Sequence, residues 1–314
     1  MRLKQERAAR LPFLKRAARE WRKNRMLYVL TLVPVVFLLL FKYMPLYGLQ
    51  IAFRNYSVTR GIWESPWVGL KYVQRFLGAY PFWNIMRNTI MISLYSLAAF
   101  PVPILLALLL NYNPSRRYRK TVQLVSYAPH FISVVVTVGM ILQFLGSRGP
   151  LNLLITALGG EAVAFMRYER YFYWILILSD LWQHAGYSAI IYIAALAGVS
   201  EELHEAAIVD GADILRRIWY IDLPCIMPTV IIMLILRFGG LLNVDFEKIF
   251  LLQNNLNLGV SEVVSTYVYK QGMASSMPQY SYSAAIGLFV SVINCAMLLL
   301  MNGTAKKLSG DSLW

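Results

Sequence analysis

The chain has 314 residues, of which 58% are hydrophobic and only 15% are charged, whereas soluble domains carry about a quarter charged residues. The apolar residues are gathered into long blocks, so an ordinary soluble domain is excluded. The formal net charge is +14, yet 10 of the 30 Lys and Arg residues precede the first apolar block. A basic cluster beside a membrane segment is typical of attraction to anionic lipid and argues against nucleic acid as the partner.

Residues 1–25 form this basic segment, which we expect on the cytoplasmic side of the membrane. Leu11, Leu14, Ala18 and Trp21 fall on one face of a helix, and Arg and Lys residues fall on the other. Such a helix suits the surface of the inner leaflet. A solvated positive tail explains the same residues, so both interpretations stay open.

Six apolar blocks follow, and each is long enough to cross a bilayer, which needs about 20 mostly apolar residues. The sequence therefore predicts six transmembrane helices over residues 26–47, 88–111, 121–145, 171–199, 225–244 and 281–301. They define a membrane domain over residues 26–302 and a tail over residues 303–314. Because no small-residue cleavage site follows the first block, it is an uncleaved anchor rather than a signal peptide.

The orientation follows from the basic residues of the connecting segments. With a cytoplasmic N-terminus, the inner segments hold 18 Lys and Arg residues and the outer ones hold nine; the inner segments are 1–25, 112–120, 200–224 and 303–314. The positive-inside rule therefore places both termini in the cytoplasm. The outer segment 48–85 is rich in aromatic residues, and we expect a short interfacial helix there.

The loop over residues 200–224 is the most informative part of the chain. Glu201 and Glu202 suit a helix N-terminus, and Gly211 tolerates the backbone angles of a helix end. Pro224 stands where the next helix begins, the position at which a missing N–H costs least. The loop therefore predicts two short helices with a turn at Gly211, projecting into the cytoplasm.

A spaced set of residues in this loop points to a family. Its members are Glu205, Ala206, Ala207, Gly211, Ile221, Leu223 and Pro224. At every position and spacing, the set resembles the signature loop of permease subunits of bacterial binding-protein-dependent ABC importers. The resemblance implies that the loop is a coupling helix, which docks on a cytoplasmic ATPase subunit and transmits its closure to the pore.

Other stretches resemble carbohydrate-uptake permeases, in particular the subgroup for complex oligosaccharides that include uronate- and rhamnose-containing fragments. These stretches are residues 67–70, 87–89, 106–111, 193–196, 243–250, 266–269 and 313–314. Asp245 stands where that subgroup has a glycine. The resemblance implies an all-α integral membrane protein with the type I ABC importer permease fold, which moves oligosaccharides from a binding protein into the cytoplasm across the bacterial inner or plasma membrane.

The resemblance also implies the partners and the place of the chemistry. The expected partners are a second homologous permease subunit, two cytoplasmic ATPase subunits, an extracytoplasmic solute-binding protein and membrane lipid. ATP and Mg would be bound by the ATPase subunits, so this chain is expected to bind no cofactor and to be no enzyme. Much of the choice of sugar would lie in the binding protein.

Polar residues within the predicted spans are candidates for the substrate path, because charges in a membrane are costly and face partners or water. The candidates are Asp180, Gln183, His184, Arg237, Asn243 and Asp245. Asp180 and His184 are four residues apart and share a helical face. Structural alternatives are an Asp180–Arg237 ion pair, a contact of His184 with the backbone, or packing of this face on the partner subunit.

Rival classes lack their own signals. No P-loop, nucleophile elbow or zinc helix is present, and the two cysteines, Cys225 and Cys295, stand alone in apolar blocks, so no metal site is expected. A proton-coupled secondary transporter often has repeat-related halves and membrane carboxylates, and the chain has neither two similar halves nor many acidic spans. That transporter class and an ABC permease for a non-sugar solute are the alternatives kept.

Overall fold

The computed structural model describes residues 13–308, 310, 312 and 313. Residues 1–12 of the expected amphipathic segment, including Leu11, lie outside these residues, as does Trp314. The chain divides at Gly69 and Leu70 into two compact units. The proposed boundaries at residues 25 and 302 stay predictions.

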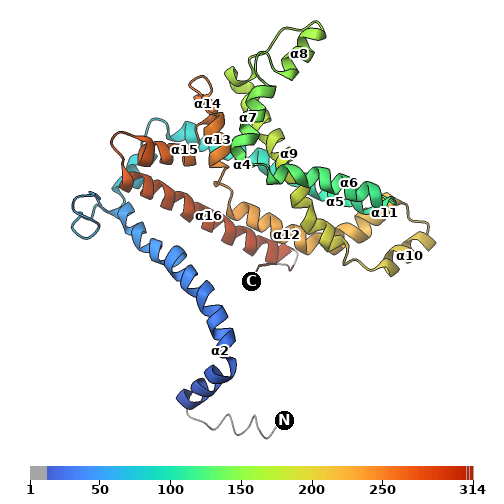
Figure 1. The fold of residues 1–314 in the computed structure, drawn as a ribbon, viewed down its shortest axis with the longest axis horizontal. Helices are drawn as coiled ribbons and strands as arrows, with labels where there is room; N and C mark the ends of the chain where they lie inside the picture. The colour runs from blue at the N-terminus through green and yellow to red at the C-terminus, as the bar shows by residue number, and fades with distance from the viewer. Residues whose placement is uncertain (1–12, 309, 311, 314) are drawn as a thin grey trace. The chain divides into compact units, whose positions relative to one another are not determined.

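The first unit is built on one long helical stretch, whose parts are α2 (Phe13–Leu38), η1 (Leu39–Tyr43) and η2 (Met44–Phe53) (Figure 1). The helix kinks at Asn24, which has a φ of −116° and a ψ of 21°. It begins before the predicted start at residue 26 and runs past the predicted end at residue 47. The apolar side chains between Met26 and Phe41 are largely exposed in the isolated chain, as expected of a helix that meets lipid or a partner.

The second unit is also helical, and the described residues of the whole chain contain two isolated β-bridges but no strand. Its elements are α3 (Lys71–Leu77), α4 (Phe82–Ala98), α5 (Pro101–Asn111), α6 (Arg116–Tyr127), η3 (Ala128–Phe131), α7 (Val134–Phe144), α8 (Pro150–Ala157), η4 (Phe165–Arg167), α9 (Glu169–Leu196), α10 (Glu201–Val209), α11 (Ile214–Arg217), η5 (Ile218–Asp222), α12 (Leu223–Gly239), α13 (Phe246–Leu252), α14 (Leu258–Ser261), α15 (Val264–Tyr269), η6 (Lys270–Ala274) and α16 (Tyr280–Leu308). α3 is the short helix expected before the second span.

Four helical stretches of the described residues are long and apolar enough to cross a membrane. They are Lys23–Phe53, Phe82–Asn111, Ile214–Gly239 and Tyr280–Leu308, and a bent pair over Arg116–Phe144 would make a fifth. The remaining predicted span, the fourth, corresponds to α9, which has 28 residues. Asp180, Gln183 and His184 dilute its apolar character, so composition alone does not count it as a span.

The third predicted span is wrong as a single helix. α6 and α7 bend by 101° at the break between Phe131 and Val134. Pro129 has no N–H to continue the helical ladder, and Ser133 starts a new helix by accepting a hydrogen bond from the N–H of Val136 (3.3 Å). The second span is likewise divided between α4 and α5, where Pro101 and Pro103 interrupt the apolar block.

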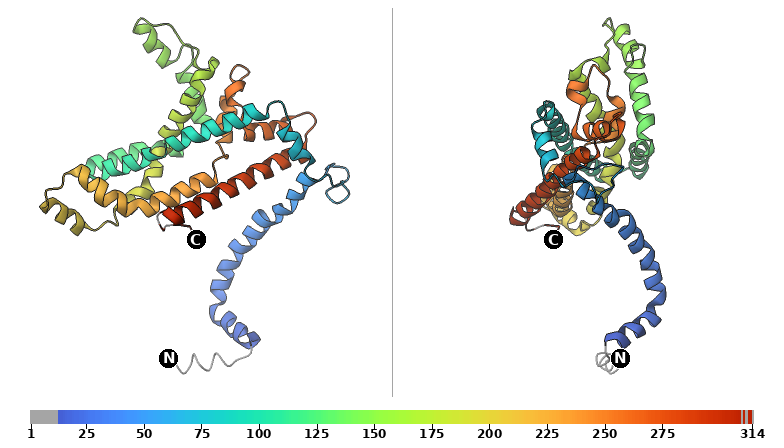
Figure 2. Two further views of the ribbon diagram at one scale, coloured as in Figure 1. Left: turned by 180° about the vertical axis from the view of Figure 1, so that it is seen from behind. Right: turned by 90° about the vertical axis from the view of Figure 1, so that its left-hand side faces the viewer.

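The long helices of the second unit pack side by side. α5 packs on α9, and α16 runs along α12 (Figures 1 and 2). Gly186 of α9 lies so close to α6 that a Cβ there would meet the carbonyl oxygen of Ser126. A hydrophobic cluster with Ile104 of α5, Tyr192 of α9 and Ile226 of α12 at its centre joins three of these helices.

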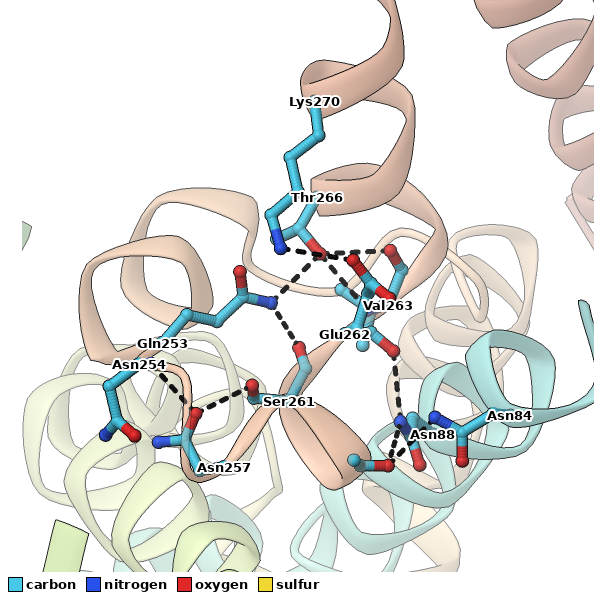
Figure 3. Close-up of polar contacts among 11 residues, drawn as sticks. Asn84, Asn88, Gln253, Asn254, Asn257, Ser261, Glu262, Val263, Thr266 and Lys270 are labelled. Atoms are coloured by element: carbon cyan, nitrogen blue, oxygen red, sulfur yellow. Dashed lines mark hydrogen bonds and ion pairs between the residues drawn. The ribbon is translucent and has the colours of Figure 1, made fainter. Parts of the chain in front are cut away.

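A dense set of hydrogen bonds, here called the α13–α15 network, fixes residues 246–270 on α4 (Figure 3). The Nδ2 atom of buried Asn88 donates to the carbonyls of Gly259 (2.9 Å) and Glu262 (3.1 Å). Gln253 Nε2 donates to the carbonyl of Ser261 (2.7 Å) and to the hydroxyl of Thr266 (3.1 Å). The stretches 87–89 and 266–269 therefore have a structural role, since they hold this segment in place.

Candidate functional site

The loop over residues 200–224 forms one separate short helix, α10, and then α11, which continues through η5 into α12 as a single helical stretch (Ile214–Gly239). The second predicted short helix is therefore the first turn of a longer one. The name elbow is used for α10, the turn at Gly211 and α11. Gly211 lies between the two helices with a φ of 76°, in the left-handed region that glycine enters without strain. Ser200 accepts a hydrogen bond from the N–H of Glu202 (3.3 Å), and Asp213 accepts one from the N–H of Arg216 (2.8 Å). Both helices therefore have their own caps.

The elbow presents apolar side chains on its surface. No residue of α10 or α11 is buried. Among the signature residues, Glu205, Ala206 and Gly211 are exposed, and Ala207 is half-buried. The exposed large apolar side chains on and just after the elbow are Leu203, Ile208, Val209, Ile214, Leu215, Trp219 and Tyr220. An exposed apolar surface of this size is typical of a protein–protein contact.

The end of the signature is attached to the interior. Pro224 stands in the first turn of α12, as predicted. Leu223 packs against the hydrophobic cluster of α5, α9 and α12. Ile221 is half-buried. The signature therefore begins on a surface and reaches the core through Leu223, although Pro224 is exposed.

Asp222, which occupies the variable position between Ile221 and Leu223 of the signature, is a buried carboxylate. Asp222 has no exposed surface, and the Tyr112 hydroxyl donates a hydrogen bond of 2.5 Å to its Oδ2 atom. His204 Nε2 lies 3.3 Å from its Oδ1 atom, and the Arg217 guanidinium lies 5.3 Å from the centre of the Tyr112 ring. Burial, followed by the contact with Asp222, raises the pKa of Tyr112 and keeps its hydroxyl a donor. These four residues are called the Asp222 cluster, and we did not predict it from the sequence.

Between α4, α9 and α12 lies a cavity of about 400 Å³, here called the polar pocket. Four of the six predicted substrate-path residues line it, namely Asp180, Arg237, Asn243 and Asp245. An adjoining cavity of about 280 Å³ is lined by His184 together with Asp180 and Arg237. Gln183 lines neither cavity, because its side chain is buried and donates to the carbonyl of Ile132 (3.0 Å).

The charged groups of the polar pocket do not form the Asp180–Arg237 ion pair that was one of the structural alternatives. Asp180 Oδ1 lies 3.1 Å from His184 Nδ1 and 3.5 Å from Lys248 Nζ. Arg237 instead donates through Nη2 to the hydroxyl of Ser96. Sequence reasoning missed Lys248, although a lysine followed by an apolar run was the available signal.

Two further residues explain how the pocket is built. Asp245, which replaces the expected glycine, caps α13 by accepting a hydrogen bond from the N–H of Lys248 (3.2 Å). Lys248 itself is fully buried, and its Nζ atom has no hydrogen-bond partner.

Within the described residues, no three His, Cys, Asp or Glu side chains are grouped so as to hold a metal ion.

Comparison with known proteins identifies the family. Residues 99–310 match the family model described as the binding-protein-dependent transport system inner membrane component. The polygalacturonan/rhamnogalacturonan transport system permease protein YteP of Bacillus subtilis (strain 168) is 40% identical over 294 residues, which cover 93% of this chain and 91% of YteP.

Two crystal structures have a similar fold. One is of a bacterial ABC transporter involved in the import of the acidic polysaccharide alginate (TM-score 0.86), and the other is of a bacterial alginate ABC transporter in complex with alginate pentasaccharide-bound periplasmic protein (TM-score 0.85). Each matched chain is 34% identical, and each match covers 94% of this chain and 99% of that one. The predicted all-α permease fold is thereby confirmed, and the chain belongs to the family of inner membrane components of binding-protein-dependent transport systems.

Proposed function

We propose that the chain is a permease subunit of an ATP-driven importer that carries acidic oligosaccharides from a binding protein into the cytoplasm. The relative YteP is named for polygalacturonan and rhamnogalacturonan, and the solved importer takes up acidic alginate. Within this chain, the observation that carries the proposal is Arg237, a cation that lines both cavities.

The chemistry of the pocket fits a uronate. A guanidinium pairs with a carboxylate through two parallel hydrogen bonds, and charge-assisted bonds are about twice as strong as neutral ones. Arg237 donates to the neutral hydroxyl of Ser96, and a substrate carboxylate would displace this weaker contact. Asn243 and Asp245 line the same pocket and supply acceptors for sugar hydroxyls.

The chain works within a larger assembly that contains a second permease subunit, two ATPase subunits and a solute-binding protein. The alginate importer structure, which includes a loaded periplasmic protein, supports the last of these. ATP and Mg belong to the ATPase subunits. The twofold excess of basic residues on the inner segments supports cytoplasmic termini and a place in the bacterial cytoplasmic membrane.

The elbow is the coupling element of this assembly. Its capped helices and exposed apolar residues form a stable shape that an ATPase groove can grip. Glu205 is exposed and offers a charge-assisted contact at the rim of that groove. Gly211 sets the angle between the two helices.

Arg237→Met tests the substrate class in proteoliposomes that contain the whole transporter and its binding protein. We expect uptake of an acidic oligosaccharide to fall about tenfold, and uptake of a neutral one to fall by less than twofold, because an order of magnitude corresponds to one lost charge-assisted contact of about 1.4 kcal/mol. Arg148→Met, which removes an exposed arginine from a loop, is the matched control.

Equal loss of acidic and neutral uptake would indicate that Arg237 only stabilises the fold. No ATP-driven uptake of either sugar by the wild-type complex would favour the alternative of an ABC permease for a non-sugar solute. The family assignment already sets aside a proton-coupled secondary transporter.

A further inference from the structure

α10 is tied to the rest of the second unit by few contacts, whereas α11 continues directly through η5 into α12. α10 has no buried residue, and its polar contact with other elements runs through His204, whose side chain is 20% exposed. His204 Nε2 lies 3.3 Å from Asp222 Oδ1. Movement of α10 therefore acts on Asp222 before it acts on any other polar group of the interior.

Asp222 connects this contact to two long helices. Tyr112 directly follows α5, and its hydroxyl donates a hydrogen bond to Asp222 Oδ2. Asp222 is also the last residue before α12, which runs without interruption from Leu223 to Gly239 and carries Arg237 near its far end. Asp222 and Arg237 are 15 residues apart in the sequence, which corresponds to about 22 Å of helix. One buried carboxylate therefore touches the elbow, the end of α5 and the start of the helix that lines the polar pocket.

The cluster is incompletely satisfied. Asp222 Oδ1, His204 Nδ1 and Arg217 Nε are buried without a hydrogen-bond partner. Buried polar groups are normally paired, because leaving them unpaired costs free energy. Arg217 lies five residues before Asp222, and the π-helix η5 between them brings residues with this spacing onto one side. An Arg217–Asp222 pair is therefore within reach when the elbow moves.

We propose that Asp222 is a positioning residue for coupling: through His204 and Tyr112 it transmits displacement of the elbow to α5 and α12. This inference rests on the proposed coupling role of the elbow. It assigns a function to residue 222, the variable position of the signature, at which the pattern requires neither a charged nor a buried side chain. Replacing the carboxylate should leave the docked elbow free to move without moving the pocket.

The test is a double-mutant cycle of Tyr112→Phe and Asp222→Asn in the reconstituted complete transporter. The readout is the ratio of ATP hydrolysis with loaded binding protein to hydrolysis without it. We expect each variant to lower the maximal ratio about five- to tenfold. The double variant should be no worse than the worse single one, because Tyr112→Phe removes the hydrogen bond to residue 222 and Asp222→Asn removes the charge that strengthens it, so both changes act on one interaction. The concentration of loaded binding protein that gives half-maximal stimulation should stay within twofold, as expected if docking is intact and transmission is lost.

Matched controls are Tyr118→Phe and Glu161→Gln, which make similar chemical changes at exposed positions outside the cluster. If Asp222→Asn does not assemble, Tyr112→Phe still tests the inference, because it removes a single hydroxyl and keeps the ring beneath Arg217. Wild-type stimulation in Tyr112→Phe, or independent losses that multiply in the double variant, would overturn the inference.

Gly211→Val distinguishes this failure from failure of the proposed coupling role. If Gly211→Val loses stimulation while the Asp222 cluster variants keep it, the elbow couples but Asp222 does not transmit. If Gly211→Val also keeps wild-type stimulation, the coupling role of the elbow is wrong, and the inference falls with it.

Discussion

The elbow and the α13–α15 network differ in how firmly each is attached to the rest of the second unit. The elbow has capped helices and no buried residue in α10 or α11. α11 continues into η5 and α12, and the polar attachment of α10 is one cluster in which three buried atoms lack a hydrogen bond. The α13–α15 segment buries Lys248, Ile249 and Thr266 and is bonded to α4 at several points (Figure 3). Segments with few buried contacts open and move at low cost, whereas densely bonded ones do not. The elbow therefore suits a moving contact, and the network suits a fixed wall of the pocket.

The largest expected effect follows from changing the turn of the elbow. Gly211→Val should abolish stimulation of ATP hydrolysis by loaded binding protein while membrane insertion is retained. A β-branched residue is strongly disfavoured at a φ of 76°, and no neighbouring atom lies within 4 Å of the added Cβ, so backbone strain is the cause. Gly211→Asn is the matched control, because asparagine enters this region more readily. Wild-type stimulation in Gly211→Val would contradict the account of a shape-dependent elbow.

A smaller effect of a different kind is expected in the α13–α15 network. Asn88→Ala removes a donor to the carbonyls of Gly259 and Glu262, and each lost hydrogen bond costs about 1 kcal/mol. The carbonyl of Gly259 keeps Asn84 as a donor, so the Glu262 carbonyl is the more affected of the two. The apparent melting temperature of the purified complex should fall by several degrees. Below that temperature, the ratio of stimulated to unstimulated ATP hydrolysis should be unchanged, because the network does not transmit movement of the elbow.

The control for this prediction lies one turn away. Asn84 also donates to the carbonyl of Gly259 (3.0 Å), but it is less buried than Asn88. Asn84→Ala should therefore lower the melting temperature less. If Asn88→Ala instead uncoupled hydrolysis from substrate at unchanged stability, the contrast between the two regions would be wrong.

The smallest effect is expected for Glu205→Ala. The carboxylate is exposed, and a partly solvated rim contact is worth about 1 kcal/mol or less. Stimulation should fall by less than fivefold, and the loss should shrink as salt concentration rises, because salt screens exposed charges. Glu205→Gln separates charge from shape. A complete loss that is insensitive to salt would place Glu205 in a desolvated contact instead of at a rim.

Much of the fold could be predicted because hydropathy and turn residues are local signals. The start of α16, the break before Pro101 and the turn at Gly211 all follow from neighbours in the chain. The end of α16 was placed too early, since the helix continues past Met301 to Leu308. The bend between α6 and α7 was missed, because Pro129 and Ser133 stand inside a continuous apolar block whose hydropathy hides the break.

The candidate sites likewise contain residues that the local sequence identifies and residues that only the tertiary fold brings together. The signature residues of the elbow are mostly exposed and close together in the chain, so the sequence pattern identifies them without knowledge of the tertiary fold. The apolar run after Lys248 was a signal for a buried lysine, but its pairing could not be predicted, because its partner Asp180 lies on a helix far away in the chain. Asp222 was hidden for the same reason, since Tyr112 and His204 approach it from separate elements. Gln183 shares a helix with Asp180, but only the packing of α9 shows that its amide faces Ile132.

Uptake by the complete wild-type transporter in proteoliposomes tests the central claim most directly. A labelled acidic oligosaccharide is supplied outside with its binding protein, and ATP is supplied on the side of the ATPase subunits. The account predicts accumulation that requires both ATP and the binding protein, exceeds accumulation of a neutral oligosaccharide of equal length, and disappears in Gly211→Val. Accumulation that proceeds without ATP, or that continues at the wild-type rate in Gly211→Val, would contradict it.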